Sequence, residues 1–356
     1  MFFASPRIPV NANSLWIARR FGLARRAFAI RPILAKTIVL GFILFASPAV
    51  TAEQVDVATP VRGLIELPIV VAMRNRYFAT EGLEIRKIQI EPEVAVKALV
   101  AEQVDFSLAW DASLGAAISG APIKLVAATA ARPLHVLMSR PEIRSGKDLK
   151  GKTLGVDELF GTTDYLSRVA MRYLGVDPDK DVNIVETGSS ALRFIELRAG
   201  SIHAAVIDAA TAARAEEEGF KRLVHLGDII DLPVFGVAVT AKKLATRREQ
   251  VKKFIRATLR GARFAKQNRT DSVRIIQSYL KITPSQAAKA YVAAVGAFTD
   301  DGFVSERALA LSVRRIREKD QIAAGADLAK VVDRTLLREI MADRRKIPSW
   351  LKQYDL

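Results

Sequence analysis

Short β-type runs alternate with helical stretches through two successive sections of this 356-residue chain, and this alternation restricts its fold more than any other feature. Strands separated by helices pair in parallel, because each helix crosses over one face of the sheet. The expected strands lie at residues 55–59, 83–90, 105–109, 124–129 and 135–139, and then at 152–156, 182–186, 204–207, 222–226 and 235–239. We therefore predict an α/β fold with two units, each a mostly parallel sheet flanked by helices.

Helical periodicity fills the gaps between these strands and then takes over the rest of the chain. The helices expected between strands lie at residues 67–79, 93–101, 112–119, 163–174, 190–199 and 209–218. Beyond residue 242 only helices are expected, at 251–266, 271–279, 284–298, 306–319 and 327–343. Helices that follow a completed unit usually return to cover the earlier one, so extra C-terminal helices are expected on the first unit.

These patterns divide the chain into a leader and two lobes. Residues 53–139 plus 241–356 are expected to form lobe 1, and residues 140–240 to form lobe 2. Two chain crossings, near residues 139–141 and 237–240, would then form the hinge between the lobes.

Residues 1–52 have the composition of a cleavable signal peptide. They contain seven Lys and Arg and no Asp or Glu, and they end in an apolar run at residues 37–50. This run is shorter than the roughly twenty apolar residues that a membrane-spanning helix needs. Small residues precede Glu53, where we expect the mature chain to begin. Arg25 and Arg26 loosely resemble a twin-arginine signal, but ordinary positive charge ahead of the apolar run favours the general secretory (Sec) route.

Charge and cysteine content narrow the partners and the compartment. The net charge of +16 falls to +9 without the leader, since 54 basic residues become 47 against 38 acidic ones. Basic and acidic residues alternate, and no basic arm, zinc spacing or helix-turn-helix pattern occurs, which argues against nucleic-acid binding. The chain has no cysteine, so it has neither disulfides nor a lipid-modified N-terminal cysteine. We expect a monomer that is free in the periplasm.

The sequence contains no motif of a known catalytic or cofactor site. None of the three histidines, His135, His203 and His225, has a partner at the spacing of a helical zinc site. There is no G-x-S-x-G elbow, no P-loop and no G-x-G-x-x-G fingerprint. We therefore predict no catalytic residue, no metal and no cofactor. The acid/base pair that an enzyme on this scaffold would use is Glu66 with Asp208.

Loops at the strand ends are the candidate ligand site, because ligands of open α/β sheets bind at that edge. The segment from Gly161 through Thr162 and Thr163 leads from a strand into a helix, with one of the two threonines as the expected N-cap. Free amides at a helix N-terminus can hold a carboxylate, sulfonate or phosphate. Capping alone would also explain the threonines.

Four further residues stand at crevice-side positions. Trp110 follows a strand, where it would be either a stacking wall for a ring or a cover for the lobe edge. The acids Glu66, Asp111 and Asp208 would accept hydrogen bonds from an amine or amidine, or would cap helices, since Asp111 precedes Ala112 and Asp208 precedes Ala209. Together these residues indicate a small organic ligand that is anionic, zwitterionic or a polar heterocycle.

Three segments resemble a known family. Residues 67–83, 148–156 and 197–205 are similar to motifs of the nitrate/sulfonate/taurine-type solute-binding proteins of ABC importers, which include the binders of thiamine-pyrimidine precursors. The sequence departs from these motifs at His203, where the family usually has Asp, and at Arg76, where it usually has Gly. The thiamine-pyrimidine synthases of this superfamily use a cysteine-rich segment, which a cysteine-free chain lacks.

The resemblance implies the two-lobed periplasmic-binding fold of type II, with an ABC permease and an ATPase as partners. The expected function is that of a non-catalytic receptor whose lobes close over the ligand. A periplasmic enzyme and a sensory partner of a membrane kinase remain as alternatives on the same scaffold.

Overall fold

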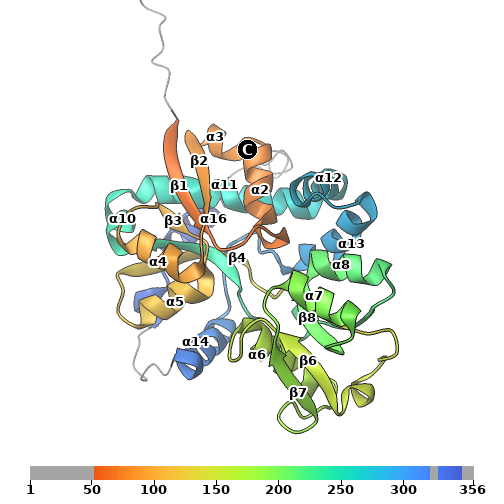
Figure 1. The fold of residues 1–356 in the computed structure, drawn as a ribbon. Helices are drawn as coiled ribbons and strands as arrows, with labels where there is room; N and C mark the ends of the chain where they lie inside the picture. The colour runs from red at the N-terminus through yellow and green to blue at the C-terminus, as the bar shows by residue number, and fades with distance from the viewer. Residues whose placement is uncertain (1–51, 321–327, 347–356) are drawn as a thin grey trace, which may run out of the picture. The chain divides into compact units, whose positions relative to one another are not determined.

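The computed structural model describes residues 52–320 and 328–346, so the expected leader lies outside the described residues except for Ala52. Two five-stranded sheets form the framework (Figure 1). The first has the order β2-β1-β3-β10-β4, with β1 Glu53–Thr59, β2 Leu83–Gln89, β3 Phe106–Ser107, β10 Phe235–Thr240 and β4 Ile123–Ala130. The second has the order β7-β6-β8-β5-β9, with β7 Val182–Glu186, β6 Lys152–Val156, β8 Ala204–Asp208, β5 His135–Ser139 and β9 Lys221–His225.

Helices flank both sheets, which confirms the predicted α/β fold. With the first sheet are α2 Leu67–Arg74, α3 Tyr77–Thr80, α4 Pro92–Val100 and α5 Trp110–Ile118; with the second are α6 Thr162–Tyr173, α7 Ser190–Ala199, α8 Ala209–Glu217 and α9 Leu226–Ile229. The C-terminal part holds α10 Ala241–Thr246, α11 Arg248–Gln267, α12 Arg269–Leu280, α13 Pro284–Ala294, α14 Glu306–Asp320, α15 Leu328–Val331 and α16 Thr335–Lys346. Short 3₁₀ turns are η1 Leu64–Glu66, η2 Gly146–Leu149 and η3 Val295–Ala297. None of the helices in the described ranges is long and apolar enough to span a membrane.

Each sheet is parallel except for one antiparallel strand. In both sheets, this strand was expected to belong to the other lobe. Strand β5 was expected in lobe 1, yet it pairs antiparallel with β8 and β9 in the second sheet. Strand β10 was expected in lobe 2, yet it pairs antiparallel with β3 and β4 in the first. The chain therefore crosses at residues 131–134, between β4 and β5, and at residues 230–234, between α9 and β10, earlier than expected both times. We call the first sheet with its helices lobe 1 and the second sheet with its helices lobe 2.

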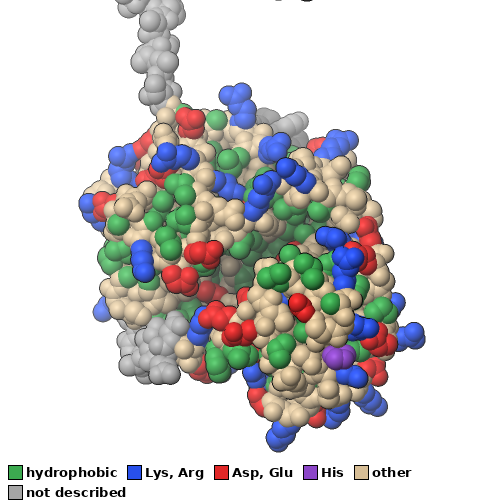
Figure 2. Space-filling model, viewed as in Figure 1, with side chains coloured by type: hydrophobic (Ala, Val, Ile, Leu, Met, Phe, Trp, Pro, Cys, Tyr) green, Lys and Arg blue, Asp and Glu red, His purple; other side chains and the backbone are tan. Residues whose placement is uncertain are grey.

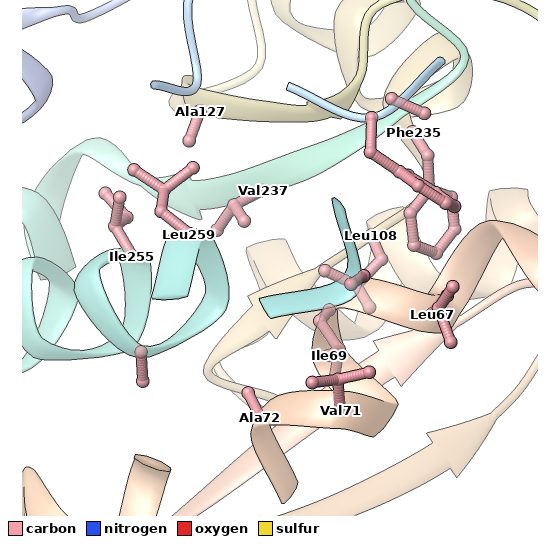
Figure 3. Close-up of a cluster of buried hydrophobic side chains, with 14 of the residues drawn as sticks. Leu67, Ile69, Val71, Ala72, Leu108, Ala127, Phe235, Val237, Ile255 and Leu259 are labelled. Carbon is pink, nitrogen blue, oxygen red and sulfur yellow. The ribbon is translucent and has the colours of Figure 1, made fainter. Parts of the chain in front are cut away.

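The core of lobe 1 forms around the long C-terminal helix α11, which lies against α2. The Phe254 ring of α11 stacks on Phe106 of β3 with 4.0 Å between ring centroids. Gly261 lets the two helices approach closely, because a Cβ there would collide with the carbonyl oxygen of Pro68. Figure 3 shows side chains from α2, β10 and α11 in this core, among them Leu67, Ile69, Val71, Phe235, Val237, Ile255 and Leu259.

Lobe 2 buries both faces of its sheet. Along β5, Leu137 lies in the cluster covered by α6, whereas Val136 and Met138 lie in the cluster covered by α7 and α8. Successive residues of a strand point to opposite faces, so a strand buried on both sides is apolar throughout. This explains why the pattern of residues 135–139 predicts a strand correctly.

Two expected helices are each divided in the structure. The helix expected at 67–79 breaks at Arg76, whose backbone is left-handed with φ 59°. The helix expected at 327–343 breaks after α15, where Val332 pairs with Leu125 of β4. The Asp333 carboxylate then accepts a hydrogen bond from the Thr335 amide at 2.8 Å and starts α16. Residue 327 lies outside the described residues.

The left-handed backbone of Arg76 generates a stability prediction. A left-handed conformation costs a non-glycine residue about 1–2 kcal/mol, part of which is offset by the greater freedom of glycine in the unfolded chain. Arg76→Gly should therefore raise the free energy of unfolding by about 1 kcal/mol, or the melting temperature by roughly 2–4 °C. Thermal unfolding of the purified variant measures this change.

Arg74→Gly is the matched control, because Arg74 is an exposed arginine within the helical part of α2. Arg74 is the last residue of α2, where glycine costs less than the roughly 1 kcal/mol of a helix interior, so this control should lower the melting temperature slightly or leave it unchanged. If both glycine variants shift it in the same direction, the account of Arg76 is wrong.

Candidate ligand-binding site

The loop from β6 to α6 ends in a helix N-terminus, as the sequence predicts, but the cap is a different residue. Gly161 is the N-cap, and Thr162 and Thr163 are the first two helical residues. Thr163 is not free to cap, because its hydroxyl donates to the Asp157 carboxylate and accepts from the Asp157 amide at 2.9 Å. The first-turn amides of an α-helix have no acceptor inside the helix, so this end of α6 favours negative charge.

Two predicted site residues from different lobes are in direct contact. The Thr162 hydroxyl at the start of α6 donates to Asp111 Oδ2 of α5 at 3.1 Å. Arg315 of α14 completes the group, with Nη2 2.5 Å from Asp111 Oδ2 and Nη1 donating to Thr162 Oγ1 at 3.3 Å. We call these three residues the Asp111 cluster. It joins the first turn of α5 in lobe 1, the first turn of α6 in lobe 2 and the C-terminal helix α14.

The Asp111 cluster contains polar atoms whose hydrogen-bonding capacity is unused. The Arg315 side chain is only 5% exposed, and its Nε has no hydrogen-bond partner among the described residues. Asp111 Oδ1 is likewise shielded and lacks a partner there. A buried polar group without a partner costs about 1–3 kcal/mol. The face shown in Figure 2 is hollowed between the elements of the two sheets, with Asp and Glu side chains along one rim.

Asp208 caps a helix, which was one of its two expected roles. Its Oδ1 accepts from the amides of Ala210 and Thr211, both at 3.0 Å, and its Oδ2 accepts from the Thr211 hydroxyl at 2.7 Å. The corresponding capping interpretation of Asp111 is wrong, because α5 begins at Trp110 and places Asp111 inside its first turn. Asp111 is therefore available for the contact with Thr162 and Arg315.

Glu66 lies in a buried network of lobe 1, where its side chain is fully shielded. Its carboxylate accepts from the Thr59 hydroxyl at 2.8 Å and from the Tyr279 hydroxyl, and Lys87 Nζ lies 2.5 Å away. Burial first, and then the hydrogen bond to Glu66, raise the pKa of Tyr279. Among the described residues, the carboxylates of Glu66 and Asp208 share no hydrogen-bond partner: Glu66 is held by Thr59, Tyr279 and Lys87, whereas Asp208 caps α8.

Comparison with known proteins assigns the chain to a family. The model of the family described as NMT1/THI5 like matches residues 66–272, more than half of the chain. The chain belongs to the NMT1/THI5-like family. This confirms the resemblance that residues 67–83, 148–156 and 197–205 indicated.

The individual relatives and structural neighbours have low sequence identity to this chain. The riboflavin-binding protein RibY of Chloroflexus aurantiacus is 26% identical over 219 residues, which cover 59% of this chain and 62% of RibY. The aliphatic sulphonate binding protein SsuA of Escherichia coli has a TM-score of 0.65 at 14% identity, covering 77% of this chain and 89% of its own. The desulfurization enzyme DSZB has a TM-score of 0.59 at 12% identity, covering 82% and 100%. The two structures share the periplasmic-binding fold with this chain.

In this NMT1/THI5-like protein, Trp110 is a core residue and not an exposed stacking wall. It is 2% exposed and belongs to the cluster formed by α4, α5, β4 and α14. Its indole lies against the backbone of Gly236 in β10, where a larger residue would collide with the ring. Trp110 is therefore not the side chain that would stack on a ring of the ligand.

Three residues near these loops were not anticipated. Phe160 is 70% exposed, with a left-handed backbone of φ 62°, directly before Gly161. Arg193 is buried, and its guanidinium donates to Ser190 Oγ at 3.1 Å and to the Val206 carbonyl at 2.9 Å. Burial lowers the pKa of Arg193, while the carboxylates of Asp157 and Asp208 oppose that shift. His135 pairs with Asp208 across β5 and β8, and burial lowers its pKa.

The sequence contains one signal that could have identified Arg315 as a candidate site residue. The buried face of α14 includes Ala308, Ser312 and Ile316, and Arg315 falls on the same helical stripe. A charged residue on an otherwise buried face needs a partner. A helical pattern with an arginine on its apolar stripe therefore indicates a candidate functional group.

The buried network of Glu66 generates a second stability prediction. Tyr279→Phe removes the hydroxyl that donates to Glu66 and leaves this shielded carboxylate without that hydrogen bond. The free energy of unfolding should therefore fall by about 1–3 kcal/mol. Tyr173→Phe is the control, because Tyr173 is 66% exposed and should lose nothing measurable. Urea unfolding of both variants measures the difference. Equal stability of the two would contradict the role of Tyr279.

Proposed function

We propose that this protein is the solute-binding component of an ABC importer, which captures a small polar organic solute between its lobes and delivers it to a membrane permease. The observation that carries the proposal is the Asp111 cluster, because the first turns of α5 in lobe 1 and α6 in lobe 2 meet there around shielded, unsatisfied polar atoms. Membership of the NMT1/THI5-like family and a fold shared with the sulphonate-binding SsuA support it.

The unsatisfied atoms of the cluster define the ligand's chemistry. Arg315 Nε needs an acceptor and Asp111 Oδ1 needs a donor, so a suitable ligand carries both kinds of group close together. The N-terminus of α6, beside Thr162, adds a preference for negative charge. The exposed Phe160 supplies an aromatic face at the same loop. A zwitterion or a polar heterocycle meets these requirements, and the relative RibY is named for a ring-containing ligand.

Binding and lobe closure are one process in this proposal. A ligand that touches Asp111 of lobe 1 and Thr162 of lobe 2 gains both contacts only when the lobes are closed. The crossing segments 131–134 and 230–234 are the proposed hinge. Closure then presents both lobes to the permease, and the leader at residues 1–52 directs the mature monomer to the periplasm.

An enzymatic function is the second candidate, because the desulfurization enzyme DSZB has the same fold. The proposed acid/base pair does not support it, since Glu66 is enclosed by Thr59, Tyr279 and Lys87 while Asp208 caps α8. Binding without turnover is the function that this geometry supports. Recovery of the bound compound unchanged after overnight incubation distinguishes the receptor from an enzyme.

A panel of taurine, benzenesulfonate, riboflavin and pyrimidines tests the receptor function on the purified mature chain. A ligand at a hundred times its dissociation constant should add about 2.7 kcal/mol to the free energy of unfolding, which a thermal-shift assay detects. Asp111→Asn and Arg315→Gln should each weaken binding at least tenfold, because each removes a charged contact in a shielded site.

Arg314→Gln is the matched control, since Arg314 is the neighbouring arginine on α14 and its side chain is 67% exposed. This variant should bind like the unmodified protein. The absence of any shift across the panel would overturn the receptor function. Undiminished binding by both cluster variants would instead exclude the Asp111 cluster as the site.

A further inference from the structure

We propose a second ligand site, separate from the Asp111 cluster, for a small organic anion with an apolar body. The site is a cavity of about 230 Å³ between lobe 2 and the C-terminal helices. We call it the crossing cavity. Six of its lining residues are Arg132, Arg222, His225, Asp228, Val292 and Gly296. None of the Asp111 cluster residues lines it.

The two sides of the crossing cavity differ in chemistry. Strand β9 supplies the guanidinium group of Arg222 and the imidazole of His225, and the first crossing segment supplies the guanidinium group of Arg132. Helix α13 and η3 supply small or apolar residues, with Val292 60% exposed. Basic groups facing an apolar wall suit a carboxylate or sulfonate attached to a ring or a short chain.

The basic groups already have acidic neighbours, but the two arginine side chains remain about half exposed in their ion pairs. Arg132 pairs with Asp231 at 2.8 Å, and both side chains are at least half exposed. Arg222 pairs with Glu216 at 2.6 Å with 47% of the arginine exposed, and His225 Nδ1 lies 3.3 Å from Asp228. Exposed ion pairs contribute little stability, so the guanidinium groups can turn to an incoming anion.

The position of the crossing cavity gives its occupant a regulatory role. Arg132 belongs to the first crossing segment, Asp228 to helix α9 of lobe 2, and Val292 to a C-terminal helix of lobe 1. An occupant therefore contacts one hinge segment and both lobes, and it favours the arrangement of the lobes in which all these contacts form. This regulatory step rests on the proposed function, whereas occupancy of the cavity does not.

The test uses benzoate as the anionic probe and benzylamine, a cation of similar shape, as the control. Isothermal titration should give saturable binding of benzoate at least tenfold tighter than that of benzylamine. Gly296→Leu should abolish it, because a Cβ on Gly296 meets no atom within 4 Å and a side chain there fills the cavity. The double variant Arg132→Gln with Arg222→Gln, at two half-exposed positions, should weaken binding at least tenfold.

Arg315→Gln separates this site from the Asp111 cluster. Benzoate binding that survives Arg315→Gln but not Gly296→Leu supports the crossing cavity. Binding that survives Gly296→Leu and the double variant but not Arg315→Gln puts benzoate in the cleft and overturns the proposal. No benzoate binding at all also overturns it, while taurine, riboflavin and the pyrimidines of the earlier panel stay an independent test of the cleft.

Discussion

The position of β10 is the constraint on which the rest of the structure depends. This strand lies between β3 and β4, so the first sheet is complete only when the chain has built the second sheet and returned. Phe235 of β10 pairs with Ala130 at the end of β4, which puts the returning crossing segment beside the departing one. Two adjacent crossings join the lobes, and the Asp111 cluster and the crossing cavity both depend on that connection.

The return of the chain also supplies the Asp111 cluster with its positive charge. Helix α14 follows the completed sheets and brings Arg315 to Asp111 of α5 and Thr162 of α6. The family model matches residues 66–272 and ends before α14, so this arginine comes from a part of the chain outside the match. Ligand preference in this protein is therefore expected to depend on residues that the shared family pattern does not contain.

Features that depend on local sequence were predicted well, and features that depend on distant partners were not. All ten strands form where the periodicity indicated them, and Asp208 caps α8 through residues two and three positions away. The sheet to which β5 or β10 belongs is decided by strand partners that periodicity does not identify. Glu66 is held by Tyr279, 213 positions away, so its burial had no local signal. At Arg76 the sequence showed that the glycine usual in the family is replaced by arginine. It did not show that this arginine has a left-handed backbone.

The central claim, that ligand binding closes the two lobes, is tested most directly by a distance measurement between them. The chain contains no cysteine, so cysteines introduced at Val94 on α4 and Tyr173 on α6, both exposed, carry the only spin labels. Pulsed electron paramagnetic resonance should show a broad distance distribution that becomes short and narrow with the panel compound giving the largest thermal shift. The Arg315→Gln variant should keep the broad distribution. An identical distribution with and without that compound would contradict the account.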